Sequence, residues 1–261
     1  MTEFFYMQKK IYFASDFHFG VPDAETSRKR EDLFVQWLEK IKVEAAEIFL
    51  MGDLFDFWFE YKTVVPRGYT RLLGKLAEIA DSGIKVHLFR GNHDMWAFDY
   101  LDKELQIEIH RDPEIRNFNN KTFYLSHGDG LGTGDRGYKF IKKVFQCRIN
   151  QWLFRWIHPD IGIGLGLFWS RKSRFANQNR ENRDPVEKQK IGSRLTLYSK
   201  KVLETHPEID YFIFGHWHYP QEIRLTEKCK QLSLGDWLTH FTYAVFDGED
   251  LKLLAFQHSG S

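Results

Sequence analysis

The chain has 261 residues, of which 43% are hydrophobic and 28% are charged, with only 7 prolines. This composition excludes a disordered, collagen-like or low-complexity chain and supplies enough apolar residues for one large domain. The 37 basic and 36 acidic residues nearly cancel, so the net charge carries no global signature of nucleic-acid binding, and an anionic partner has to be attracted by a local patch.

The cysteine content and the lengths of the apolar runs indicate the cellular localisation. Cys147 and Cys229 lie far apart in the sequence, so they form neither a metal-binding pair nor a disulfide framework. The N-terminal segment has no long apolar stretch behind a basic one, and no apolar run approaches the roughly 18 residues of a membrane-spanning helix. We therefore expect a cytoplasmic protein. Peripheral association with the cytoplasmic face of the inner membrane is compatible with this expectation.

Five short apolar runs along the chain share one kind of ending. They cover residues 11–15, 48–52, 86–91, 122–126 and 211–215. Short aromatic-rich runs bounded by Gly or Ser are typical of buried strands. Each run opens into a loop that carries polar side chains, which are Asp16, His18, Asp53, Asn92, His93, Asp94, His127, His216 and His218.

Helical patterns separate the first strands. Residues 31–41 and 69–80 each place apolar side chains along one helix face. The alternation of strands and helices predicts an α/β fold, with ligands bound at the carboxyl ends of the strands. Four short apolar patterns lie beyond residue 218, and we expect them to form an antiparallel sheet that closes the domain. They cover residues 222–226, 231–234, 242–246 and 251–256.

The stretch from about residue 138 to residue 200 differs from the rest of the chain. It has helical periodicity and none of the polar strand endings, and it interrupts the series between His127 and His216. We therefore predict a single domain over residues 1–261 with a helical cap inserted at about 138–200.

The polar strand endings favour a metal centre. Carboxylates and imidazoles together suit Mn²⁺, Fe²⁺, Zn²⁺ or Mg²⁺, and seven such ligands exceed what one ion with an open position requires. Two ions with one bridging carboxylate, most simply Asp53, fit the number. Two ions about 3.5–4 Å apart stabilise both the attacking and the leaving oxygen of an in-line displacement, which suits phosphate esters. One such ending alone is often just a turn, but turn chemistry rarely produces five.

The same residues carry a family resemblance. The segments Asp16-x-His18, Gly52-Asp53-x-x-Asp56, Gly91-Asn92-His93-Asp94, His127-Gly128-Asp129 and Gly215-His216-x-His218 resemble, in order, the motifs of the calcineurin-like metallophosphoesterases. The resemblance implies a β-sandwich flanked by helices. It also implies one ion held by Asp16, His18, Asp53 and His218, and a second held by Asp53, Asn92, His127 and His216, with Mn²⁺ as the expected ion.

Two neighbours of Asn92 are candidate catalytic residues. His93 is expected to contact a phosphoryl oxygen or the leaving group and to stabilise developing charge; the alternative is a mere turn residue. Asp94 is the candidate to hold the His93 imidazole, although adjacent side chains often diverge. Asn92 and His93 are thus both expected at the substrate.

Within that family, residues 50–58, 81–83 and 127–138 resemble the UDP-2,3-diacylglucosamine pyrophosphatases of lipid A synthesis. This resemblance implies a nucleotide-sugar lipid substrate that is cleaved to UMP and diacylglucosamine 1-phosphate, with Asp135 and Tyr138 at the substrate. One position departs from it, because His93 stands where that group has Arg. A related nucleotide pyrophosphate or a broader phosphodiester therefore remains an alternative substrate.

The composition of residues 138–175 fits a lipid. This stretch contains eight basic residues and one acid, Asp160, among many aromatic and aliphatic side chains, a mixture typical of interfacial or acyl-chain-binding elements. Arg171, Lys172 and Arg174 are expected to bind substrate. The alternative is ordinary packing in which Lys and Arg stems cover apolar surface. The glycines at 162, 164 and 166 allow close backbone approach.

Two other functions are disfavoured. A nucleic-acid phosphodiesterase would use a basic groove with aromatic side chains for stacking, which residues 138–175 imitate. A noncatalytic scaffold would typically have lost metal-binding histidines, and all four are present. The sequence gives no indication of the oligomeric state.

Overall fold

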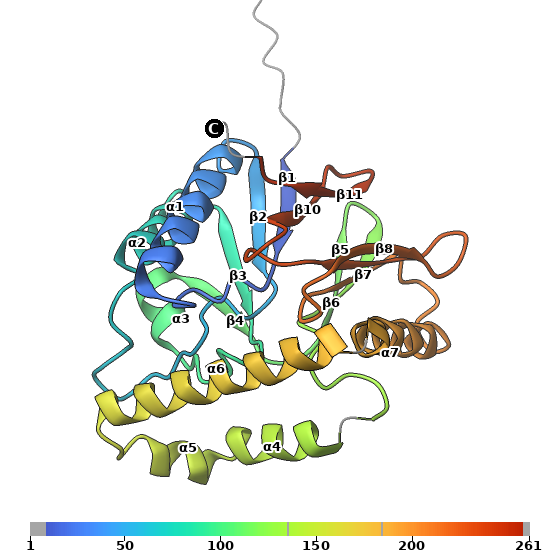
Figure 1. Cartoon of the computed structure of the whole chain (residues 1–261). Coiled ribbons are helices and arrows are strands. Elements are labelled where there is room, and N and C mark those ends of the chain that lie inside the picture. The colour runs from blue at the N-terminus through green and yellow to red at the C-terminus, as the bar shows by residue number, and fades with distance from the viewer. Residues whose placement is uncertain (1–8, 135, 184, 258–261) are drawn as a thin grey trace, which may run out of the picture.

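Two β-sheets form the centre of the molecule (Figure 1). The computed structural model describes residues 9–134, 136–183 and 185–257, and it describes no side chains between residues 174 and 190. The first sheet has the order β11-β10-β1-β2-β3-β4. Its strands are β1 (Lys10–Ala14), β2 (Ala45–Leu50), β3 (Lys85–Phe89), β4 (Ile107–His110), β10 (Thr242–Phe246) and β11 (Leu251–Ala255). Strands β1 to β4 are parallel, and β10 pairs antiparallel with β1.

The second sheet has five strands in the order β5-β6-β7-β9-β8. They are β5 (Glu114–Phe118), β6 (Lys121–Ser126), β7 (Tyr211–Phe214), β8 (Pro220–Arg224) and β9 (Lys230–Leu234). The expectation that the C-terminal strands form one antiparallel sheet is wrong. The β8–β9 hairpin extends the second sheet, where β9 runs parallel to β7, whereas the β10–β11 hairpin extends the first sheet.

The two sheets pack face to face over an aromatic core. Phe13 of the first sheet stacks on Phe49 of the same sheet and on Phe123 of the second, with ring centroids 5.1 Å and 6.0 Å apart. Ile213 and Leu232 complete this layer from the second sheet, and all five side chains are fully buried. The predicted sandwich of two sheets flanked by helices is thereby confirmed.

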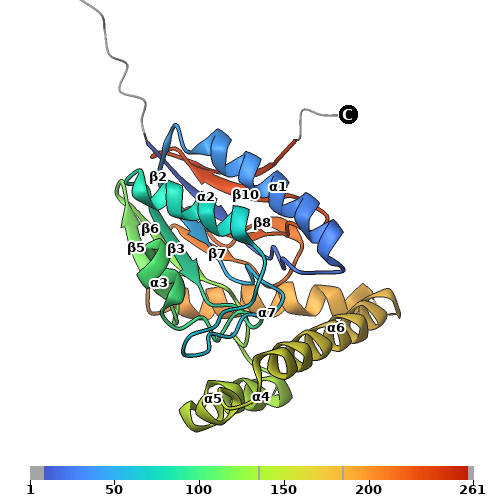
Figure 2. The ribbon, with the colours of Figure 1, turned by 90° about the vertical axis from the view of Figure 1, so that its left-hand side faces the viewer.

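Helices cover the outer face of the first sheet, which is turned toward the viewer in Figure 2, and a further helix packs on the second sheet. The first sheet is covered by α1 (Ala24–Ile41), α2 (Thr70–Asp81) and α3 (Tyr100–Leu105). Helix α1 begins after Asp23, whose carboxylate accepts a hydrogen bond from the Thr26 backbone N–H at 2.8 Å. Helix α7 (Pro185–Leu203) packs on the second sheet through Leu195.

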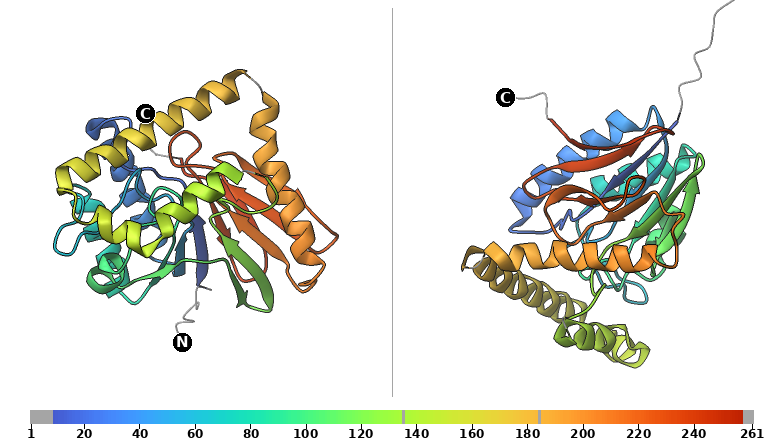
Figure 3. Two further views of the ribbon diagram at one scale, coloured as in Figure 1. Left: turned by 90° about the horizontal axis from the view of Figure 1, so that it is seen from below. Right: turned by 90° about the vertical axis from the view of Figure 1, so that its right-hand side faces the viewer.

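Three further helices lie between β6 and β7 in the sequence and gather at one end of the sandwich (Figures 1 and 3). They are α4 (Arg136–Gln146), α5 (Arg148–Phe154) and α6 (Pro159–Arg183). An aromatic cluster attaches them to the loops that follow β2 and β3: the Phe154 ring lies 4.7 Å from Phe59 and 5.2 Å from Trp96, whose indole N–H donates to the Phe145 carbonyl at 2.8 Å.

Among the helices in the described part of the chain, none combines the length and apolar character that a membrane crossing demands.

Candidate metal centre

The carboxyl ends of five strands meet at the end of the sandwich that faces α6 (Figures 1 and 3). Strands β1, β2 and β3 are parallel in the first sheet, and β6 and β7 are parallel in the second, so their carboxyl ends lie at the same side. The loops after these strands carry the seven ligands expected from the sequence, which are Asp16, His18, Asp53, Asn92, His127, His216 and His218.

The backbone at these strand ends adopts a rare conformation. Asp16, His18, Asp53, His216 and His218 all have positive φ angles, between 45° and 65°. Such a conformation costs a non-glycine residue about 1–3 kcal/mol and persists only where the surrounding structure enforces it. Its recurrence at five of the seven expected ligands indicates that the fold is constrained to aim these side chains inward.

Glycines beside these residues allow the loops to approach one another. Gly52 has a φ of 102°, and a Cβ atom at Gly91 would lie 2.1 Å from Asp53 Oδ1. A side chain at Gly91 would therefore displace the Asp53 carboxylate, which explains why a glycine precedes Asn92.

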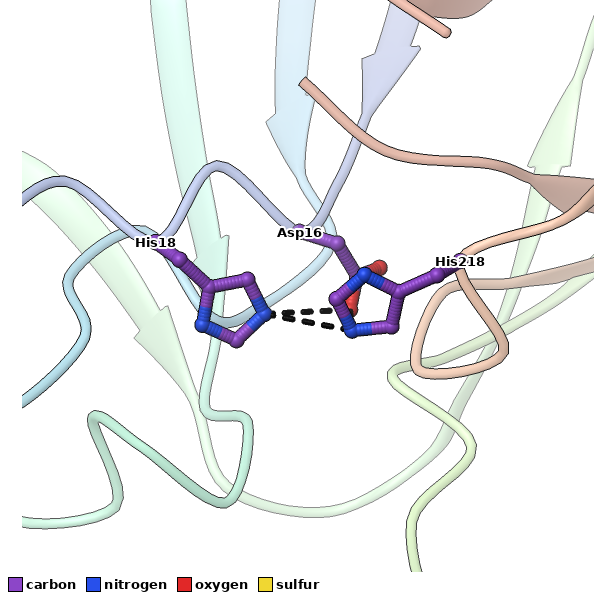
Figure 4. Close-up of side chains that lie close together, drawn as sticks. All are labelled: Asp16, His18 and His218. Atoms are coloured by element: carbon purple, nitrogen blue, oxygen red, sulfur yellow. Dashed lines mark hydrogen bonds and ion pairs between the residues drawn. The ribbon is translucent and has the colours of Figure 1, made fainter. Parts of the chain in front are cut away.

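Asp16, His18 and His218 form the first cluster of candidate ligands (Figure 4). The Nε2 atoms of His18 and His218 are 3.3 Å apart, and Asp16 Oδ1 lies 3.4 Å from His218 Nε2 and 3.8 Å from His18 Nε2. Asp16 and His18 are buried, while the His218 side chain is about one third exposed. The cluster thus opens to solvent on the side of His218.

Asp53, His127 and His216 form the second cluster, and Asp53 joins it to the first. Asp53 Oδ2 lies 3.4 Å from His127 Nε2 and 3.6 Å from His18 Nε2. One carboxylate oxygen therefore faces both clusters, as a bridging ligand would.

The pKa values of the residues in the second cluster are shifted in different directions. Burial disfavours ionisation of Asp53, yet the neighbouring His127 and His93 hold its pKa well below the usual range. Burial likewise disfavours the charged form of His127, but Asp53 raises its pKa to about 10. Burial and the charge on His127 lower the pKa of His216 to about 4. The buried carboxylate thus stays ionised and attracts positive charge.

The residues fit divalent cations. Asp16 Oδ1, Asn92 Oδ1 and His127 Nε2 are buried and have no hydrogen-bond partner, a costly arrangement unless something else satisfies them. Carboxylate, amide and imidazole ligands suit borderline and hard divalent ions, and His127 Nδ1, 2.7 Å from the Met51 carbonyl, has the backbone partner typical of metal-binding histidines.

The surroundings of His93 differ from expectation. Its Nδ1 donates to the Asp56 carbonyl at 2.8 Å and lies 3.7 Å from Asp56 Oδ1. Ser170 of α6 donates to Asp56 Oδ2 at 2.7 Å and lies 3.1 Å from the same His93 nitrogen. The imidazole is therefore held by Asp56 and Ser170.

Asp94 has a different place from the one expected for it. Both of its oxygens accept backbone hydrogen bonds, from the N–H groups of Leu54 and Gly91, each at 2.7 Å. Burial and the proximity of Asp53 raise the pKa of Asp94 to about 7. Asp94 therefore ties the loop after β3 to the loop after β2, and the expectation that it holds the His93 imidazole is corrected to Asp56.

Sequence reasoning missed Asp236. Its Oδ2 lies 3.4 Å from His218 Nδ1, and its Oδ1 accepts hydrogen bonds from backbone N–H groups, including those of Thr239 and His240. Burial alone would raise the pKa of Asp236, but these partners hold it well below the usual range. A signal was present, because Gly235-Asp236 follows the buried strand β9 as Gly52-Asp53 follows β2.

The expected substrate contacts divide into three groups. Tyr138 lies near the second cluster, with its ring centroid 6.5 Å from that of His216, and its hydroxyl donates to Asp129. Arg171 and Lys172 are exposed on α6, directly after Ser170. Asp135 lies outside the described residues, as does the side chain of Arg174.

Several known proteins are similar to this chain. The chain is similar to the UDP-2,3-diacylglucosamine hydrolase of Porphyromonas gingivalis, at 38% identity over 95% of this chain and 97% of that protein. A protein of the same name from Histophilus somni is 24% identical over 88% of this chain and 92% of its own length. Among solved structures, the phosphoesterase Yfce from E. coli has a TM-score of 0.45 at 14% identity, covering 94% of this chain and 92% of that one. A family model described as calcineurin-like phosphoesterase matches residues 9–220. The chain therefore belongs to the calcineurin-like phosphoesterase family.

Proposed function

We propose that the chain is a two-metal hydrolase that cleaves the pyrophosphate bond of UDP-2,3-diacylglucosamine, releasing UMP and diacylglucosamine 1-phosphate. The observation that carries the reaction class is the Asp53 carboxylate, whose Oδ2 faces His18 of one cluster and His127 of the other. The substrate is supported by the relative of that name, which is 38% identical over nearly the whole of both chains.

Each ion would be held by residues of both sheets. One would be bound by Asp16, His18, Asp53 and His218, and the other by Asp53, Asn92, His127 and His216. Two divalent ions supply Lewis-acid chemistry, activating water and neutralising charge on the phosphate oxygens. We propose Mn²⁺ as the ion, because the mixed carboxylate and imidazole set suits it.

His93 would act on the substrate through its second nitrogen. Because a carbonyl only accepts hydrogen bonds, the 2.8 Å contact to Asp56 places the proton on His93 Nδ1. Burial lowers the pKa of His93, whereas the charges of Asp53 and Asp56 favour its protonated form. Nε2 donates a hydrogen bond only in that protonated form. We assign the protonated imidazole the role of positioning a phosphoryl oxygen beside Asn92.

The helices α4 to α6 would receive the lipid part. The exposed apolar side chains of these helices and of the turn after α5 include Phe140, Trp152, Trp156, Ile161, Leu165, Phe168 and Trp169. Basic residues such as Lys143, Arg171 and Lys172 accompany them on the same helices. Exposed aromatic residues beside cations favour acyl chains and anionic lipid headgroups. We therefore propose peripheral contact with the cytoplasmic face of the inner membrane, with Arg171, Lys172, Arg174, Asp135 and Tyr138 near the substrate.

Product analysis with purified protein tests this function. With Mn²⁺ present, we expect release of UMP from UDP-2,3-diacylglucosamine and little cleavage of single-stranded DNA. His127→Ala should abolish the release, whereas His206→Ala, which replaces an exposed histidine outside the centre, should leave it unchanged. Preferential cleavage of DNA would overturn the substrate, and binding without turnover at a metal-loaded centre would indicate a scaffold. Reconstitution with Mn²⁺, Fe²⁺, Zn²⁺ or Mg²⁺ in turn tests the ion.

A further inference from the structure

Two buried histidines lie apart from the strand ends that form the phosphoesterase centre. His87 lies within β3 and His110 ends β4, and their residues are 0% and 3% exposed. The His87 ring stacks on Phe49 with centroids 4.2 Å apart and an interplanar angle of 9°, and the His110 ring stacks on Phe89 at 4.6 Å. Both imidazoles are therefore fixed in orientation, and the proposed reaction uses neither.

The outer nitrogen of each imidazole faces a carboxylate of its own. His87 Nε2 lies 3.0 Å from Glu47 Oε2 of β2, and His110 Nδ1 lies 2.6 Å from Glu114 Oε1 of β5. An ionised carboxylate only accepts hydrogen bonds, so these contacts place the proton of each neutral imidazole on its outer nitrogen. The inner nitrogens, His87 Nδ1 and His110 Nε2, then present lone pairs.

These lone pairs converge with a third acceptor. His87 Nδ1 and His110 Nε2 are 3.1 Å apart. Glu108 places Oε2 3.1 Å from His87 Nδ1 and Oε1 3.7 Å from His110 Nε2. Three acceptors at such distances require a cation between them, either a shared proton or a metal ion. Ligand atoms about 2.0–2.2 Å from a tetrahedral Zn²⁺ lie about 3.3–3.6 Å from one another, and the observed spacings bracket that range.

We propose that His87, His110 and Glu108 form a third metal site, separate from the phosphoesterase centre, that binds a divalent transition-metal ion such as Zn²⁺. Two imidazoles and a carboxylate are a ligand set suited to Zn²⁺, with one position left for water. Glu47 and Glu114 supply the hydrogen bonds to the outer nitrogens that metal-binding histidines usually have.

The charge and position of the cluster are consistent with a stabilising ion. The cluster contains three carboxylates, those of Glu47, Glu108 and Glu114. Arg116 contacts Glu108 at 3.1 Å and Glu114 at 2.9 Å, and Lys85 lies opposite Glu47 in the β2–β3 pairing. The carboxylates outnumber these two cations, and a bound metal ion offsets the remaining negative charge. The Glu108 side chain is 56% exposed, so an ion can enter from solvent. Strand β4 lies at the edge of the first sheet and β5 at the edge of the second. The ion would therefore stabilise the connection between the two sheets.

Metal counting on the full-length protein, with the phosphoesterase centre loaded, tests the site. After dialysis against micromolar Zn²⁺, elemental analysis should give one more ion per chain for the wild type than for Glu108→Gln. Glu104→Gln is the matched control, because it replaces an exposed carboxylate on the neighbouring helix α3 and should keep the wild-type count. Glu108→Gln is preferred to a histidine variant because its exposed side chain can be replaced without disturbing the core.

Two further measurements locate the ion. Anomalous diffraction at the zinc edge should show a peak within about 2.2 Å of His87 Nδ1 and His110 Nε2. Glu47→Gln, which removes only the partner of the outer nitrogen, should weaken Zn²⁺ binding at this site about 10- to 100-fold while the far-UV circular dichroism stays unchanged. Equal metal counts in wild type and Glu108→Gln, or a cluster without an anomalous peak, would overturn the proposal and leave the two imidazoles sharing a proton.

Discussion

The His93 side chain is fixed at one nitrogen by Asp56 and Ser170 and contributes no atom to either proposed ion. We therefore expect His93→Ala to lower kcat by about 10²- to 10⁴-fold, the usual range for one acid–base or charge-stabilising group, with the bound Mn²⁺ unchanged by elemental analysis. Ser170→Ala, which removes one of the two partners, should have a smaller effect in the same direction. Loss of metal from His93→Ala would show that the residue is structural.

Asp236 orients His218 without being a proposed ligand. Asp236→Asn keeps an oxygen for the backbone N–H groups of Thr239 and His240 and removes the charge that faces His218 Nδ1. We expect Mn²⁺ to bind about 10- to 100-fold more weakly, as for other residues that hold a ligand in place, in a titration followed by activity and by isothermal calorimetry. Glu227→Gln, an exposed acid in the turn between β8 and β9, is the control. Unchanged Mn²⁺ affinity of Asp236→Asn would show that Asp236 has no part in metal binding.

The sequence predicts the identity of the candidate ligands better than their partners. Six of the seven expected ligands lie together in two clusters. They were predictable because strand ends and polar side chains are both visible in the sequence. The contact of His93 with Asp56 instead of Asp94 was not predictable, since the direction of each side chain depends on local φ angles. The position of Asp236 depends on β9 pairing with β7, a contact between distant residues that a local pattern does not encode.

At the scale of elements, the packing of α6 depends on glycine spacing. A Cβ atom at Gly166 would lie 2.2 Å from the Phe57 ring, whereas one at Gly164, two residues earlier in α6, would have nothing within 4 Å. Gly166→Ala should therefore push α6 and its Ser170 away from Asp56 and lower kcat/KM. Gly164→Ala is the matched control, and it should stabilise the helix by about 0.5–1 kcal/mol without loss of activity. Steady-state kinetics and thermal unfolding of the two variants check this, and equal activities would contradict it.

The exposed surface of α5 and of the turn that follows it offers a second test at this scale. Trp152 and Trp156 are 57% and 75% exposed, whereas the intervening Phe154 packs on Phe59 and Trp96. Replacing both tryptophans by Ser should raise KM for the diacylated substrate and leave KM for a deacylated analogue unchanged, because only acyl contacts are lost. Leu197→Ser, on the exposed side of α7, is the control. A similar rise in KM for both substrates would refute acyl-chain binding.

Long amphipathic helices and buried strands were predictable from their periodicity, but short elements were not. Strands β4 and β5 have few apolar residues, and α3 has only six residues. The hairpin between β5 and β6 has a recognisable turn, since Asn119 and Asn120 both have positive φ and asparagine tolerates that conformation. The distribution of the C-terminal hairpins between two sheets was not predictable, because strand propensity does not specify a partner.

For the whole molecule, the metal centre should contribute to stability. Asp16 and Asp53 are buried carboxylates at the junction of the two sheets, and ions that bind only the folded state stabilise it by about 2.7 kcal/mol at 100 times the dissociation constant. We expect EDTA to lower the Tm measured by calorimetry and added Mn²⁺ to restore it. Asp53→Asn should show a much smaller difference. Identical Tm values with and without chelator would mean that the centre binds no ion in solution.

The division of the ligands between the two sheets has a consequence for biogenesis. Each proposed ion draws on loops of the first sheet and on His127, His216 or His218 of the second, and β1, the first strand to be synthesised, lies beside β10, one of the last. A nascent chain therefore has no complete coordination sphere until residue 218 has emerged from the ribosome and the halves have docked. Complete metal binding must therefore wait until most of the chain has been synthesised, so the ions available at that moment determine which cation the enzyme acquires.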